Sequence, residues 1–83
     1  MNGGDKMDAV LVGSRIKKLM RKKNITLEQL SNMMEIDEKE LEKKLEGKEE
    51  FFIGEMAKIK VIFELELKEF DELFFKEEKY SKI

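Results

Sequence analysis

Four residue types are missing from this 83-residue chain: cysteine, proline, tryptophan and histidine. Without cysteine and histidine there is no disulfide, no thiolate or imidazole metal site and no nucleophile–histidine pair for catalysis. We therefore expect no cofactor, no metal ion and no enzymatic activity. Apolar runs also fall short of the roughly 18 residues of a membrane span, and the polar first residues lack the apolar segment of a signal peptide. These absences predict a cytoplasmic protein without membrane contact.

What the chain has in abundance is charge, since 43% of its residues are charged and 41% are apolar. This composition is typical of one folded domain with a packed core. The net charge of −2 is unevenly distributed. Up to Asn24 there are seven basic and two acidic residues, a charge of +5, whereas the other ten basic and seventeen acidic residues give −7. A basic binding surface and a merely solvated basic helix face explain this distribution equally well.

Hydrophobic periodicity predicts an all-α domain of five helices. The predicted helices cover residues 8–24, 27–34, 38–46, about 53–63, and a last one around 70–74. A capping box of Thr26 and Gln29 and an N-cap at Asp37 begin the second and third helices. A strand over 61–67 is the alternative, because apolar and polar residues alternate there, but strong helix formers on both sides disfavour it.

The compact domain is predicted to span residues 8–75, with 1–7 as a flexible N-terminal arm and 76–83 as a polar tail. Only residues 35–37 separate the second and third helices. So short a connection forces the two helices to cross steeply, which is the geometry of a helix-turn-helix.

Five segments carry a resemblance to a known family: RIKKLM at 15–20, ITLEQL at 25–30, ID at 36–37, GK at 47–48 and FDELFF at 70–75. In this order and at these spacings the chain resembles the Cro and lambda-repressor type (XRE-like) helix-turn-helix proteins, especially small phage or prophage regulators. The resemblance implies the lambda-repressor-like fold and a sequence-specific, DNA-binding transcriptional regulator.

In that family the third helix enters the major groove while neighbouring residues hold the phosphates. Mapped here, the base-facing residues are Glu38, Lys39, Glu40, Glu42 and Lys43. The expected phosphate contacts are Arg15, Lys17, Lys18, Arg21, Thr26 and Lys48. The expected partner is duplex DNA.

The chain also departs from the family pattern. From residue 37 to residue 46 there are five carboxylates against three lysines, a charge of −2 on the helix that should meet a polyanion. Leu27 stands where the family usually has a phosphate-binding glutamine, and Glu35 where glycine often provides a positive φ. Met20 and Leu45 stand where some members bury an arginine–glutamate pair, a replacement that can be neutral or stabilising.

Two further expectations concern partners. The aromatic residues near the end of the last helix exceed what a small monomer needs to cover itself, so a homodimer is expected. The interface candidates are Leu73, Phe74, Phe75 and Tyr80.

The alternative function is a helix-turn-helix module that has lost DNA binding and docks a protein, such as a basic one, on its acidic third helix. Basic side chains of the first helix beside the groove-facing end of the third helix favour DNA, whereas basic side chains on the opposite side favour the protein partner.

Overall fold

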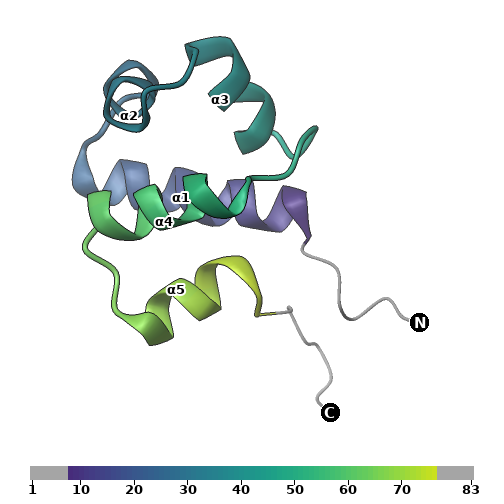
Figure 1. Cartoon of the computed structure of the whole chain (residues 1–83), viewed down its shortest axis with the longest axis vertical. Helices are drawn as coiled ribbons and strands as arrows, with labels where there is room; N and C mark the ends of the chain where they lie inside the picture. Colours follow the sequence, from purple (N-terminus) through teal and green to yellow (C-terminus); the bar gives the residue numbers. More distant parts are fainter. Residues whose placement is uncertain (1–7, 77–83) are drawn as a thin grey trace.

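The computed structural model describes residues 8–76, and this part of the chain contains five α-helices and no strand (Figure 1). The helices are α1 (Ala9–Lys23), α2 (Leu27–Met34), α3 (Glu38–Leu45), α4 (Ile53–Ile62) and α5 (Leu67–Phe74). In Figure 1, α2 and α3 lie on one side of α1 and α4, and α5 lies on the other side. The predicted all-α, five-helix fold is confirmed, and the stretch considered as a strand is helix and turn. The predicted arm, and the predicted tail after Lys76, lie outside the described residues.

Local hydrogen bonds explain where most helices begin. The backbone N–H of Gln29 donates to Thr26 Oγ1 (3.1 Å), and the N–H of Thr26 donates to Gln29 Oε1 (2.9 Å), which is the predicted capping box. Asp37 occupies the predicted N-cap of α3, but its side chain makes no capping hydrogen bond. The start of α5 was predicted about three residues too late. Glu69 accepts a hydrogen bond from the backbone N–H of Glu66 (2.8 Å), which fixes that first turn.

The core is built from apolar side chains of all five helices and of the segments between them. Its buried members are Val12, Ile16, Met20, Leu30, Met34, Leu41, Leu45, Phe51, Met56, Ile59, Phe63, Leu65, Leu73 and Phe74. Two of these residues correct the predicted dimer interface: Leu73 is 6% exposed and Phe74 is 1% exposed. The Phe74 ring packs edge-on against Phe51, with centroids 6.2 Å apart. Because these side chains fill the monomer, they are not available to a partner.

The other two interface candidates have different outcomes. Phe75 follows α5 and is 53% exposed, so its ring is accessible. Tyr80 lies outside the described residues. The predicted interface therefore keeps one accessible residue in the described part of the chain.

A close approach of two backbones positions α3 on α1. A Cβ added to Gly13 of α1 would collide with the carbonyl oxygen of Leu45 and would lie 2.7 Å from its carbonyl carbon. Glycine in the middle of α1 is therefore required by the packing of α3.

Met20 and Leu45, the expected apolar replacements for an ion pair, are both buried, with 8% and 5% of their surface exposed.

The turn between α2 and α3 has the strained backbone that the sequence suggested. Glu35 has a φ of 62° and Glu64, between α4 and α5, has a φ of 55°. Side chains with a Cβ adopt this left-handed region at a cost that glycine avoids. A backbone hydrogen bond closes each turn: the N–H of Ile36 donates to the carbonyl oxygen of Ser31 (3.1 Å), and the N–H of Leu65 donates to that of Lys60 (2.9 Å).

Candidate nucleic-acid interface

The outer face of α3 carries every residue that was predicted to face bases. All five of them are exposed, whereas Leu41, Lys44 and Leu45 form the buried face. The burial of Lys44 changes the charge of the exposed face. Asp37, Glu38, Glu40, Glu42 and Glu46 now oppose only Lys39 and Lys43, so the exposed charge is −3.

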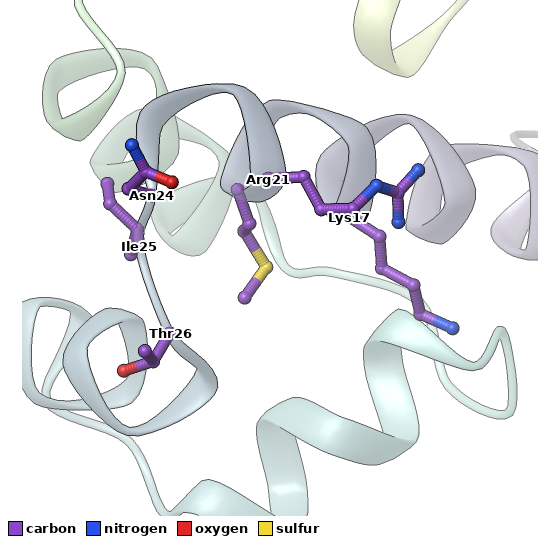
Figure 2. Close-up of a pocket in the computed structure, with 6 residues that line it drawn as sticks. Lys17, Arg21, Asn24, Ile25 and Thr26 are labelled. Atoms are coloured by element: carbon purple, nitrogen blue, oxygen red, sulfur yellow. The ribbon is translucent and has the colours of Figure 1, made fainter.

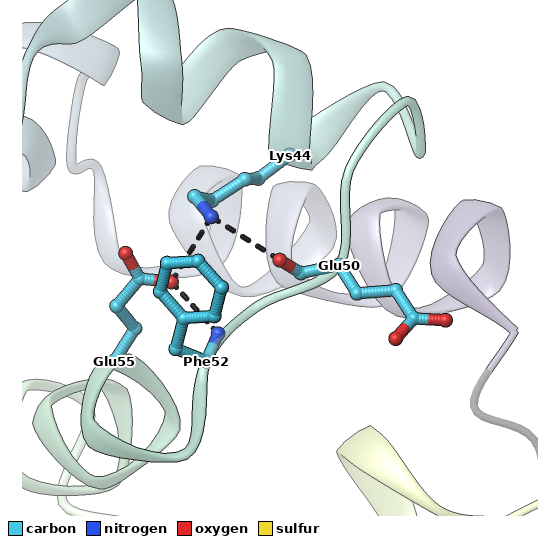
Figure 3. Close-up of polar contacts among 4 residues, drawn as sticks. All are labelled: Lys44, Glu50, Phe52 and Glu55. Atoms are coloured by element: carbon cyan, nitrogen blue, oxygen red, sulfur yellow. Dashed lines mark hydrogen bonds and ion pairs between the residues drawn. The ribbon is translucent and has the colours of Figure 1, made fainter.

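Lys44 is the one buried cation of the described residues, with a side chain only 1% exposed. Its Nζ lies 3.2 Å from Glu55 Oε1 and donates to the carbonyl oxygen of Glu50 at 3.1 Å (Figure 3). The Phe52 ring covers the ammonium, with its centroid 4.2 Å from Nζ. Glu55 Oε1 also accepts a hydrogen bond from the backbone N–H of Phe52 (2.9 Å). These contacts join the end of α3 to the first turn of α4 across the intervening loop.

Sequence reasoning missed this role of Lys44, although a signal was present. Lys44 follows Leu41 by three residues, a spacing that places both side chains on the same face of a helix. The position therefore belongs to the buried face, and burial of a lysine requires a partner.

Three of the predicted phosphate contacts come together in one pocket between α1 and the start of α2 (Figure 2). The pocket has a volume of about 370 Å³ and is lined by Lys17, Met20, Arg21, Asn24, Ile25 and Thr26. Lys17 and Arg21 are exposed, and neither forms an ion pair with any residue in 8–76. In Figure 2 both side chains extend along α1 away from Thr26 and the start of α2, and the Lys17 side chain reaches toward α3. Two exposed positive charges without an ion pair in residues 8–76 therefore lie on α1, and one of them is directed toward α3.

The remaining predicted phosphate contacts lie elsewhere. Arg15 Nη1 donates to the carbonyl oxygens of Glu72 (2.7 Å) and Leu73 (3.1 Å), so this side chain binds the C-terminal turn of α5. Lys48 is exposed and pairs with Glu46 at 3.1 Å. Lys18 is exposed on α1. Arg15 has a structural role that the sequence did not reveal.

No family model, curated protein or solved structure matches this chain. The resemblance to the XRE-like family therefore stays a prediction from the residues themselves. None of the helices within residues 8–76 has the length and apolar character needed to cross a membrane. The same residues contain no group of three metal-binding side chains placed to hold an ion.

Proposed function

We propose that this chain is a sequence-specific DNA-binding transcriptional regulator of the kind found among small phage or prophage proteins, with α3 entering the major groove. The observation that carries the proposal is the shared pocket of Lys17, Arg21 and Thr26. It places two cations of α1 that lack an ion pair in residues 8–76 in one pocket with Thr26, and the Lys17 side chain reaches toward α3 (Figure 2). Phosphate neutralisation supplies most of the affinity of proteins for DNA, so cations in this place favour a nucleic-acid partner.

Three of the six pocket residues have specific roles in the proposed complex. Lys17 and Arg21 neutralise phosphates on one strand. Thr26 Oγ1 already accepts the N–H of Gln29, so its hydroxyl hydrogen is free to donate to a phosphate oxygen. That donor compensates in part for Leu27, which has no polar group to offer.

The exposed face of α3 supplies base contacts in this proposal. Lys39 and Lys43 can donate to guanine O6 or N7, and Glu38, Glu40 and Glu42 can accept from cytosine N4. The same carboxylates repel the phosphates beside the groove. Affinity therefore rests on α1, and we expect it to depend steeply on salt.

The test is a fluorescence-anisotropy titration of the protein against a pool of short duplexes at about 50 and 200 mM salt. The double variant Lys17→Ala/Arg21→Ala is compared with Lys68→Ala on α5, which lies on the other side of α1 from α2 and α3 (Figure 1). We expect the double variant to reduce the slope of log K against log salt by roughly 2, one unit for each lost phosphate contact. The Lys68→Ala variant should bind like the wild type. An equal loss of DNA affinity in the double variant and in Lys68→Ala would contradict the assignment of Lys17 and Arg21 to the DNA-binding surface.

The burial of Lys44 favours a second candidate, a protein-interaction module whose acidic α3 docks a basic partner. The substitution Glu42→Lys separates the two functions, because it changes the exposed charge of α3 from −3 to about −1. It should strengthen DNA binding if α3 approaches DNA. It should weaken binding of a lysine-rich peptide if α3 is a docking surface for basic proteins.

A further inference from the structure

An uncharged stripe runs along the outer face of α4. Ile53, Ala57 and Val61 are spaced four residues apart, with Gly54 beside Ile53, and we call these four residues the α4 stripe. All four are exposed, with Ile53 at 81% and Val61 at 74%. In a chain with 43% charged residues, this row of three apolar side chains and a glycine leaves the outer face of α4 without a charge along two turns.

Gly54 has no explanation within the described part of the chain. A Cβ added there would meet no atom within 4 Å. Glycine weakens a helix relative to alanine, so an unneeded glycine in the first turn of α4 is a cost. A glycine on a helix surface allows another chain to approach the backbone closely.

We propose that the α4 stripe is a self-association surface on which a second copy of this chain packs its own α4 in the antiparallel direction, with Ala57 on the two-fold axis. In such a pair, residues equally far from Ala57 in opposite directions face each other. Ile53 then meets Val61 of the second copy, and Gly54 leaves room for the side chain of Lys60. The pattern is self-complementary, as an isologous interface requires.

Charge supports the antiparallel direction. Lys60, near the C-terminal end of α4, forms no ion pair in the described residues. The loop before α4 exposes Glu49 and Glu50, and the Glu50 carboxylate points away from Lys44 (Figure 3). Antiparallel packing brings the C-terminal half of one α4 to the N-terminal end of the other. Lys60 of each copy then approaches Glu49 and Glu50 of the other copy. The two-fold symmetry produces this contact twice.

The size of the stripe sets the strength of the association. The exposed apolar area of these four residues is roughly 300 Å², whereas a stable interface buries about 800 Å² on each partner. The dimer is therefore weak and its population rises with protein concentration. This inference does not depend on DNA binding, since α3 and the pocket residues take no part in it.

Cross-linking tests the proposed geometry directly, because the chain contains no cysteine and one substitution introduces a unique thiol. The variant Ala57→Cys places two thiols near the two-fold axis, where Cα atoms about 5.5–6 Å apart allow a disulfide. Met33→Cys, 46% exposed on α2, is the matched control. We expect mild oxidation of the full chain to convert Ala57→Cys to a covalent dimer at least about tenfold faster than Met33→Cys. Equal rates for the two variants would overturn the proposal.

Sedimentation velocity tests the association without a cross-link. We expect the sedimentation coefficient of the wild type to rise between about 20 and 500 µM, as for a weak interface. The rise should vanish for Ala57→Glu, which places two like charges together at the axis, and persist for Met33→Glu. Circular dichroism establishes that both variants are folded. A wild-type protein that stays monomeric over this range, or an Ala57→Glu variant that still associates, would exclude the proposed dimer.

Discussion

Replacing Lys44 with methionine tests whether the buried ion pair fastens the end of α3 to α4. The side chains of Lys44 and Glu55 are 1% and 12% exposed. Removing one partner of a buried pair costs about 3–5 kcal/mol, because the remaining charge is left in a poorly solvated place. Methionine retains most of the buried aliphatic chain, and Glu55 keeps its bond from the N–H of Phe52. We therefore expect a loss near the lower limit, about 3 kcal/mol of unfolding free energy.

A double-mutant cycle isolates the ion pair from the packing. The double variant Lys44→Met/Glu55→Gln removes both charges, so it should lose less than the sum of the single variants. We expect a coupling energy of about 2 kcal/mol or more. Urea unfolding followed by far-UV circular dichroism gives each value, which suits a chain without tryptophan.

The exposed pair of Lys48 and Glu46 is the matched control. Their side chains are 69% and 40% exposed, so solvent screens the attraction and we expect coupling below about 0.5 kcal/mol. Coupling between Lys44 and Glu55 as small as this would refute the role of the buried pair in fastening α3 to α4, since the two pairs have nearly the same N–O distance.

Three further substitutions test other features of the fold. Gly13→Ala should destabilise the protein by about 3 kcal/mol in urea unfolding, because the new methyl group meets the Leu45 backbone; an unchanged midpoint would contradict the close approach. Glu35→Gly should raise the unfolding free energy by up to about 1 kcal/mol, since glycine adopts a φ of 62° without the strain that a Cβ causes. A lower unfolding free energy would show that this strain is absent. Arg15→Ala removes two hydrogen bonds to α5, worth about 1–2 kcal/mol in total, so amide hydrogen exchange in α5 should become faster. Faster exchange in α1 alone would argue against the binding of α5 by Arg15.

Local signals allowed most of the fold to be predicted. The capping box of Thr26 and Gln29 involves residues three apart, so its hydrogen bonds are encoded within one turn. The positive φ of Glu35 agrees with the glycine that the resembled family often has at this turn position. Periodicity likewise placed α1 to α4 to within about one residue at each end.

Long-range contacts account for what the sequence did not reveal. The partners of Arg15 lie 57 and 58 residues away on α5, so no local pattern distinguishes it from the phosphate-binding cations. Phe74 is buried in part against Phe51, which lies in the loop before α4. The partners of Lys44 likewise depend on the path of that loop. The exposed face of α3 was predictable because helical spacing alone determines it.

We propose that this chain binds duplex DNA through the cations of α1 and the exposed face of α3. The most direct measurement is the anisotropy titration of the folded wild-type protein with short duplexes at about 50 and 200 mM salt. We expect binding at the lower salt that weakens by at least about tenfold at the higher salt, because two or more phosphate contacts are lost to screening. A folded protein that binds no duplex at about 50 mM salt would contradict it and would favour a protein partner for α3.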